Sequence, residues 1–268
     1  MKNFAPYRVH SRFKLDRLNP RATPFAQGSA TAQFKHLKEL ALELDLLQNQ
    51  LHAEGRRKVL LVLQGMDTSG KDGTIRWVFA RCSPLGVGVT AFKAPSDTER
   101  ARDYLWRCHA AVPAAGQIMI WNRSHYEDVL VPVVEGWIDK KEAQRRYAQI
   151  NDFERLLVET GTVVIKCMLH ISKDEQRTRL QERIDTASKQ WKFARSDLET
   201  RKKWEPYQRA YQRALTATST AHAPWHVIPA DDKSQRNLMV AHLLIRHLKK
   251  MKLHLPPADP SLHGLIVE

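Results

Sequence analysis

The apolar residues of the chain follow two alternating patterns. In the first, they recur at every third or fourth position, which is typical of a helix with one buried face, as at Phe34, Leu37, Leu40, Leu44, Leu47 and Leu51. In the second, they form short runs, which occupy 59–63, 88–92, 117–121, 162–171 and 225–229. Runs that are apolar on both faces are typical of parallel strands buried between helices. The alternation predicts an α/β protein, a parallel sheet sandwiched by helices.

The helical pattern predicts elements over 33–51, 70–81 and 140–160, with a last helix after residue 229. Gly55 ends the first of them, which covers the core. Within 140–160, four apolar side chains are expected to face inward, namely Tyr147, Ile150, Phe153 and Leu157.

Two segments depart from the alternation. Residues 1–30 carry Pro6, Pro20, Pro24 and Gly28, and predict an extended N-terminal arm on the surface. Residues 31–268 are then expected to form a single domain. Within it, about 172–220 reads as two charged helices without a strand, with 12 Lys and Arg against 7 Asp and Glu between 171 and 215. This module, inserted before the last strand, is predicted to be a lid over the carboxyl edge of the sheet, which suits phosphoryl transfer.

The charge balance indicates a polyanionic partner. The 268 residues include 43 Lys and Arg and 29 Asp and Glu, for a formal net charge of +14. Such an excess favours nucleic acid, an acidic membrane surface or a phosphorylated substrate, unless it is only a solvated surface. No apolar run is long enough to cross a membrane. The three cysteines, Cys82, Cys108 and Cys167, lack metal-site spacing and are expected to be free thiols. A cytoplasmic protein is the expectation.

The segment GMDTSGKDG, residues 65–73, follows the first strand and opens a helix. It fits the phosphate-binding pattern G-x-x-x-x-G-K, which ends at Lys71. Backbone N–H groups of Thr68, Ser69, Gly70 and Lys71 are expected to face phosphate oxygens, with the ammonium of Lys71 beside a terminal phosphate.

This loop carries two acids where the usual pattern has none. Asp72 stands where Ser or Thr normally helps to hold Mg²⁺, and Asp67 lies inside the loop. Asp67 is predicted to bind Mg²⁺ or to orient the attacking phosphate. For Asp72 a helix-start role is at least as well supported, because the helix dipole favours an acid there.

Further polar residues follow the other strands. The segment NRSHYED follows the run 117–121 and contains Asn122, Arg123 and Glu127. So many polar residues are unsuited to a core, but they suit a binding site at the carboxyl end of a strand. His125 within this segment is more often structural. Lys93 follows the strand 88–92 and Arg107 ends a short helix. Both could bind phosphates at the carboxyl edge of the sheet, and the alternative is that they are solvated surface charges.

Taken together, these segments resemble the type 2 polyphosphate kinase family. The likeness runs from about residue 7 to residue 250. Five motifs stand in the family's order: GMDTSGKDG, FKAP with DYLWR, NRSHYEDVL, KQWKF with a later Asp, and TSTAHAPWHVIPADDK. Five motifs in one order are much more specific than one.

The resemblance implies a P-loop kinase fold with a helical lid, so residues 31–268 are expected to be a single P-loop kinase domain. It also implies reversible, Mg²⁺-dependent phosphoryl transfer between inorganic polyphosphate and nucleotides, with Mn²⁺ as a substitute metal. Asp67 and Lys71 match the family's essential acid and lysine, with Asp67 as the metal ligand. In the lid, five residues match its basic, phosphate-binding positions, namely Arg179, Arg183, Lys189, Lys192 and Arg201.

One departure bears on the substrate. Many relatives read D-R-S-W-Y-N-R where this chain reads N-R-S-H-Y-E-D, so Asn122 replaces an Asp and Glu127 an Asn. This form resembles the third subclass, whose members accept both AMP and ADP. It leaves open whether Glu127 touches the metal or the nucleotide.

The expected partners are therefore polyphosphate and AMP, ADP and ATP, with guanine nucleotides as a further option. No nucleic acid or membrane is expected, and the chain is expected to form a homodimer or homotetramer. Two alternatives remain open: an ATP-dependent nucleotide kinase of thymidylate-kinase type, and a basic nucleic-acid-binding protein. The choice of donor distinguishes the first, and salt-dependent binding that survives Lys71→Ala distinguishes the second.

Overall fold

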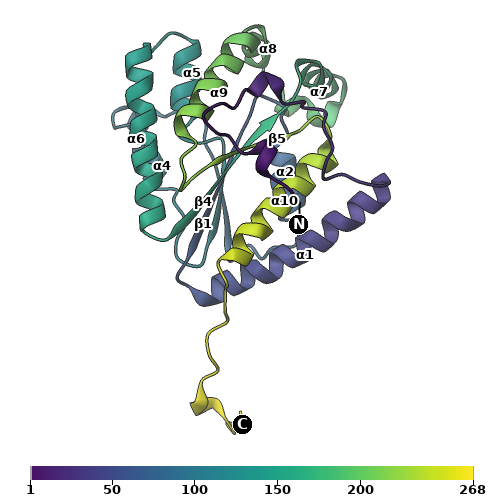
Figure 1. The fold of residues 1–268 in the computed structure, drawn as a ribbon, viewed down its shortest axis with the longest axis vertical. Coiled ribbons are helices and arrows are strands. Elements are labelled where there is room, and N and C mark those ends of the chain that lie inside the picture. The colour runs from purple at the N-terminus through teal and green to yellow at the C-terminus, as the bar shows by residue number, and fades with distance from the viewer. Residues whose placement is uncertain (1, 268) are drawn as a thin grey trace.

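A five-stranded parallel sheet forms the centre of the protein, as seen in a computed structural model that describes residues 2–267 (Figure 1). The strand order is β2-β3-β1-β4-β5. The strands are β1 (Lys58–Gln64), β2 (Val87–Ala91), β3 (Ile118–Asn122), β4 (Thr162–His170) and β5 (Trp225–Pro229). All neighbouring pairs are parallel, which confirms the predicted α/β fold.

Helices cover both faces of this sheet (Figure 1). On one face α1 (Ala30–Glu54) packs against α2 (Lys71–Val78) and α10 (Lys233–Lys250). On the other, α9 (Trp204–Thr218) packs against α5 (Glu127–Val134) and α6 (Lys140–Glu159). Residues 59–63 of β1 are fully buried because both faces are covered, which explains their apolar character.

The predicted helix faces are largely those observed. The four side chains of α6 expected to face inward are all buried. Helix α1 starts after Ser29, whose hydroxyl accepts the N–H of Ala32, and ends at Gly55, where φ is 63°. Phe34 at its start is exposed and lies edge-on to Trp77 rather than in the core.

The N-terminal arm is tied to the domain by apolar side chains. It contains two short turns of 3₁₀ helix, η1 (Ala5–Tyr7) and η2 (Leu15–Arg17). The N–H of Val9 donates to the carbonyl of Trp225 on β5 over 2.9 Å. Along the arm, five apolar side chains are buried in the core, namely Phe4, Val9, Phe13, Leu15 and Phe25. The arm is thus extended but anchored.

The region before β5 holds more helices than the two that were expected. It consists of α7 (Lys173–Asp185), η3 (Ala187–Lys192), α8 (Arg195–Lys202) and α9. Strand β2 is followed by α3 (Asp97–Arg100) and α4 (Trp106–His109), so Arg107 lies in the first turn of a helix and does not end one. A last turn, η4 (Pro260–Leu262), lies near the C-terminus.

Two further expectations can be compared with the structure. Cys108 and Cys167 are buried and Cys82 is half-buried, all as free thiols. Within residues 2–267, no helix is both long and apolar enough to span a bilayer.

Candidate active site

The phosphate loop connects β1 to α2 in a backbone shape that needs glycine. Gly65 has φ of 151° and Gly70 has φ of 99°. A Cβ on Gly65 would lie 2.6 Å from the carbonyl oxygen of Leu169, and one on Gly70 would lie 1.8 Å from Nη1 of Arg236. Thr68, between them, is also left-handed at φ 65°. The two glycines therefore permit the turn and the close approach of neighbouring elements.

Three successive carbonyls of this loop accept hydrogen bonds from side chains of distant helices. Gln176 on α7 donates to the carbonyl of Asp67 over 3.2 Å. Arg179, one turn on, donates to that of Thr68 over 2.9 Å. Arg236 on α10 donates to that of Ser69 over 3.5 Å. The loop is thus held from outside by two helices, and its conformation does not depend on its own short sequence alone.

Lys71 is buried at the start of α2, where the cavity meets the loop. Its ammonium donates to the carbonyl oxygen of Gly65 over 2.8 Å and to that of Met66 over 3.3 Å. Burial, and then the positive charge of Arg123, lower the pKa of Lys71 to about 8. The acids nearby act in the opposite direction. An anionic phosphate beside this ammonium would be strongly favoured because little water screens the site.

The two acids of the loop have different partners. Asp67 accepts a hydrogen bond of 2.9 Å from the guanidinium of Arg123. Asp72 accepts one of 2.7 Å from the side-chain amide of Asn122. Arg123 has φ of 64°, a left-handed conformation that costs free energy for a residue with a side chain. The end of β3 therefore faces the phosphate loop through one ion pair and one hydrogen bond from an amide to a carboxylate.

A cavity of about 640 Å³ opens between the loop, the ends of β2 and β3, and the lid. Nine cationic side chains line it against four acids. The cations are Lys71, Lys93, Arg123, Arg179, Arg183, Lys189, Lys192, Lys233 and Arg236, and the acids are Asp67, Asp72, Glu182 and Asp197. The cavity also reaches Thr68, Gly70 and Asn122. Most of the residues predicted from the sequence therefore meet at one place.

Not every lining cation is equally available to a ligand. Arg179 already donates to three carbonyls, those of Thr68, Ala230 and Asp231, and to the carboxylate of Glu175. Lys189 pairs with Glu182, and the ammonium of Lys192 lies over the Trp191 ring. Arg179 is built into the wall, whereas the lysines are on the lid surface.

Four of the predicted residues lie outside this cavity. Ser69 is fully buried, and its N–H donates within the loop to Met66. Glu127, at the start of α5, accepts a hydrogen bond of 3.1 Å from the side chain of Gln64 at the end of β1. Arg201 donates to the carbonyl of Lys173 and to Gln176 on the lid.

Arg107, the fourth, lines a separate cavity of about 310 Å³. Its guanidinium donates to the carbonyl of Lys93 over 2.8 Å and to Asp128 over 3.3 Å. It thus reaches the active-site cavity only indirectly, by holding the backbone of Lys93.

Several residues of the site belong to none of the sequence patterns that predicted the others. Gln176, Lys233, Arg236 and Asn237 were not predicted. Arg236 is 3% exposed, and burial followed by the charge of Arg179 lowers its pKa to about 9. A buried arginine beside glycines of a phosphate loop could have been suspected from ADDKSQRN, which directly follows the last strand.

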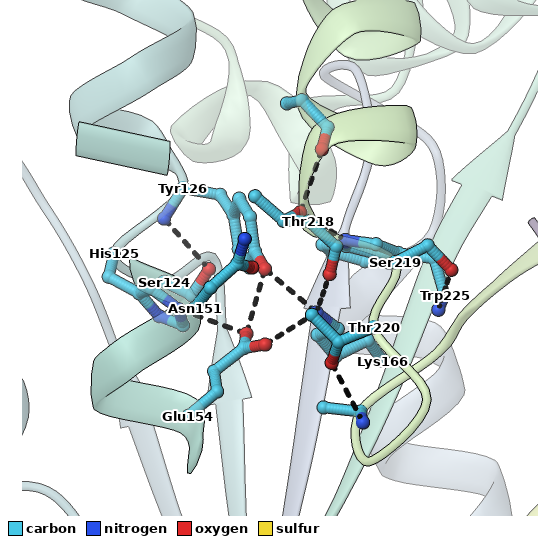
Figure 2. A network of polar contacts seen from close by, with 12 residues as sticks. Ser124, His125, Tyr126, Asn151, Glu154, Lys166, Thr218, Ser219, Thr220 and Trp225 are labelled. Carbon is cyan, nitrogen blue, oxygen red and sulfur yellow. Dashed lines mark hydrogen bonds and ion pairs between the residues drawn. The ribbon is translucent and has the colours of Figure 1, made fainter. Parts of the chain in front are cut away.

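The polar stretch after β3 divides between the cavity and the core. Asn122 and Arg123 line the cavity, while His125 and Tyr126 point into a buried network with Glu154 and Lys166 (Figure 2). His125 is therefore the structural histidine that its sequence context favoured.

The acid and the base at the centre of that network are both hydrogen-bonded, whereas Nδ1 of His125 has no hydrogen-bond partner among the described residues. The ammonium of Lys166 donates to Glu154 over 2.6 Å, to the Tyr126 hydroxyl over 2.9 Å and to the carbonyl of Thr218 over 2.7 Å (Figure 2). Tyr126 in turn donates to Glu154 over 2.7 Å. Burial raises the pKa of Glu154, but Lys166 and then His125 more than offset this and lower it. The network joins β4, the residue before α5, α6 and the end of α9.

Fold and site together define a class. A parallel sheet with a glycine-bounded loop before α2, cations converging on that loop and a charged helical module over it are the parts of a P-loop phosphotransferase. Residues 27–256 match the family described as Polyphosphate kinase 2. The chain belongs to this family.

Individual relatives agree with this assignment. The chain is 47% identical over 264 residues to the AMP/ADP-polyphosphate phosphotransferase of Meiothermus ruber, covering 98% of this chain and 99% of that one. It is 40% identical to the ADP-polyphosphate phosphotransferase of Rhodopseudomonas palustris, over 80% of this chain and 78% of that one. The crystal structure of polyphosphate kinase 2 from Arthrobacter aurescens TC1 superposes with a TM-score of 0.92 at 45% identity, covering 96% and 94% of the two chains.

Proposed function

We propose that the protein transfers phosphoryl groups reversibly between inorganic polyphosphate and adenine nucleotides, from AMP to ADP and from ADP to ATP. The observation that carries this proposal is the cavity in which Lys71 and the lid cations face one another around the phosphate loop. The activities for which the Meiothermus ruber and Rhodopseudomonas palustris relatives are named support the same donor and the same acceptors.

The charge of the cavity supports a polyanion as donor. A nucleoside triphosphate presents three phosphates, whereas nine cationic side chains surround this space. Opposite charges that face each other in a partly buried cleft attract strongly and raise the local concentration of an anionic substrate. A linear chain of phosphates can engage cations of the loop and of the lid at once.

The transfer itself requires positioning more than proton transfer. The attacking oxygen of AMP or ADP is already ionised, so no strong general base is needed. Lys71 and Arg123 would neutralise the charge on the transferred phosphoryl and on the leaving phosphate. Arg123 is pre-oriented for this by its ion pair with Asp67.

The donor set of the loop fits a divalent cation of the Mg²⁺ type. Mg²⁺ is commonly held by one or two carboxylates together with substrate phosphates and waters. Asp67 and Asp72 lie on one wall of the cavity, and no group of three or more His, Cys, Asp or Glu suited to a metal occurs in residues 2–267. Asp67 would hold Mg²⁺, or Mn²⁺ in its place. The bound ion would neutralise charge on the phosphates during transfer.

The acceptor nucleotide is proposed to lie beside the end of β3. Asn122 lines the cavity and Glu127 stands one turn later, held by Gln64. Glu127 would place the acceptor rather than the donor. Guanine nucleotides remain candidates for the same place.

Three further expectations remain predictions. Residues 172–220 would act as a lid that closes over the phosphates, with α7 as its fixed base, because Gln176 and Arg179 already hold the loop. The protein would form a homodimer or homotetramer, which its molecular mass in solution would show. Localisation to the cytoplasm would be seen by fractionation of the source cells.

The test supplies purified protein with Mg²⁺, polyphosphate and AMP, and follows ADP and then ATP by chromatography. Formation of both products supports the proposal. Absence of product with both AMP and ADP as acceptor overturns it. Product formed only when ATP replaces polyphosphate as donor assigns the protein to the ordinary nucleotide kinases instead.

A further inference from the structure

A second large cavity lies at the opposite edge of the sheet from the candidate active site. Its volume is about 830 Å³, and we name it the rear cavity. Its floor is the start of β4, at Thr162, Val163 and Val164. The N-terminal arm and the end of α10, which lie side by side, form its walls (Figure 1). The nine residues of β4 run from this edge to the other, a length of about 30 Å at 3.3 Å per residue.

The charged residues that line the rear cavity are all basic. Five are Lys or Arg and three are His, namely Lys2, Arg8, Arg57, Arg246, Lys250, His222, His226 and His247. Of the described residues, no Asp or Glu lines it. The three other cavities described for this chain each contain at least two acids. A general excess of basic residues on the surface does not account for this difference.

Most of these cations also form no ion pair with an acid. Arg57 forms two hydrogen bonds of 2.7 Å with Glu54. Within residues 2–267, the other four, Lys2, Arg8, Arg246 and Lys250, take part in no ion pair. Unbalanced like charges around one space repel each other, and a bound anion relieves that repulsion.

The same positive charges surround a buried histidine in the cavity wall. His226 is 5% exposed in the cavity wall, and its Nδ1 has no hydrogen-bond partner in the described structure. Burial, and then His247, Arg8 and Arg246, lower its pKa to about 3. His226 thus stays neutral, and the positive charge of the cavity is carried by arginine and lysine, which hold it at all physiological pH values.

We propose that the rear cavity binds a run of linked phosphates and anchors the distal part of a long polyphosphate chain whose end lies in the candidate active site. The anchoring role rests on the function proposed above, whereas binding of linked phosphates does not. A chain held at two places dissociates more slowly, because release at one place leaves a high effective concentration for rebinding. Because the two cavities lie at opposite ends of the sheet, whose strand β4 alone is about 30 Å long, a tripolyphosphate can occupy only one of them at a time.

The lining favours phosphates over a nucleobase. Apart from histidines, the one aromatic ring among the described lining residues is that of Phe4. Phe4 is 3% exposed, and the guanidinium of Arg246 lies 5.6 Å from its ring centre. A base would find little ring surface for stacking there, while a phosphate chain needs only the cations.

The first test measures binding of tripolyphosphate by calorimetry. The triple variant Arg8→Gln/Arg246→Gln/Lys250→Gln removes three rear cations. Its matched control, Lys35→Gln/Lys140→Gln/Lys141→Gln, removes three exposed lysines outside every described cavity. The wild type and the control should bind at two sites. In the rear variant one of these should weaken by about tenfold, the sum of three partly screened charge interactions.

The second test measures steady-state kinetics with AMP as acceptor. The rear variant should raise KM for long-chain polyphosphate by about tenfold, with unchanged kcat and unchanged KM for tripolyphosphate. The control variant should match the wild type throughout. Equal KM values for the long chain in the two triple variants overturn the anchoring role.

The remaining outcomes separate this proposal from the proposed function. Identical binding of tripolyphosphate by both triple variants overturns the proposal that the rear cavity binds linked phosphates. Binding of AMP but not of tripolyphosphate in the rear cavity overturns it as well. A wild type that makes no ADP from polyphosphate overturns the proposed function and the anchoring role, and leaves phosphate binding to be judged by calorimetry. If the triple variant does not fold, Lys250→Gln, at an exposed position, serves in its place, with a smaller shift in the same direction.

Discussion

The guanidinium of Arg179 and the carbonyl oxygen of Thr68 are 2.9 Å apart, although 111 residues separate them in the chain. The same guanidinium also donates to the carbonyls of Ala230 and Asp231. One side chain therefore joins the phosphate loop, the first lid helix and the turn after β5. A basic lid position of the family thus acts in this structure as a fixed support of the loop.

Replacing Arg179 by Lys should lower kcat by about 10²-fold, because a single ammonium cannot reach three carbonyls on two segments and the loop would shift. Arg177→Lys, on the exposed face of the same helix, should match the wild type. Steady-state rates with polyphosphate and AMP make the comparison. A wild-type kcat in Arg179→Lys would contradict the supporting role.

Lys71 should give the reaction an alkaline limit. Burial and Arg123 lower its pKa to about 8, so the free enzyme loses this positive charge as the pH rises through that value. Because kcat/KM reports the free enzyme, it should fall above a pH of about 8, by about tenfold per pH unit at the limit. The fall in kcat should come at higher pH, since bound phosphates favour the ammonium.

Lys71→Arg is the control for this pH profile. A guanidinium stays charged throughout the range, so the fall in kcat/KM near pH 8 should vanish even if the rate is lower. Polyphosphate concentration is varied at each pH to separate kcat from KM. An unchanged alkaline limit in Lys71→Arg would assign that limit to another group.

The loop could be predicted from the sequence because its chemistry is local. Asp67, Gly70 and Lys71 stand at fixed spacing after an apolar run, and the structure brings them to one cavity. The strands could be predicted for a related reason, since burial on both faces requires uninterrupted apolar residues, as at 59–63.

The supports of the loop could not be predicted, because they come from distant helices. Gln176 reaches Asp67 across 109 residues, and Arg236 reaches Ser69 across 167. Neither contact has a spacing that a local pattern records. Within NRSHYED, the sequence favoured a structural role for His125, which is fully buried, but the local pattern did not show that Tyr126 beside it would be almost fully buried as well.

The two acids of the loop should differ in their importance. Asp67→Asn keeps the shape but removes the charge that holds Arg123 and is proposed to bind Mg²⁺, so activity should fall by more than about 10²-fold. Asp72→Asn still offers a side-chain oxygen to Asn122 and should stay within about tenfold of the wild type. Rates measured over a series of Mg²⁺ concentrations make the comparison. Equal losses in the two variants would mean that Asp72 shares the role assigned to Asp67.

The buried pair of Lys166 and Glu154 should matter for stability in a way that depends on which partner is removed. Lys166→Met leaves the carboxylate of Glu154 buried without its cation, which should lower the free energy of unfolding by about 3–5 kcal/mol. Adding Glu154→Gln removes that stranded charge and should recover part of the loss. The exposed Lys140→Met should change stability by less than about 0.5 kcal/mol. Urea unfolding at constant pH measures all three variants, and a double variant no more stable than Lys166→Met would show that the stranded charge is not the cause.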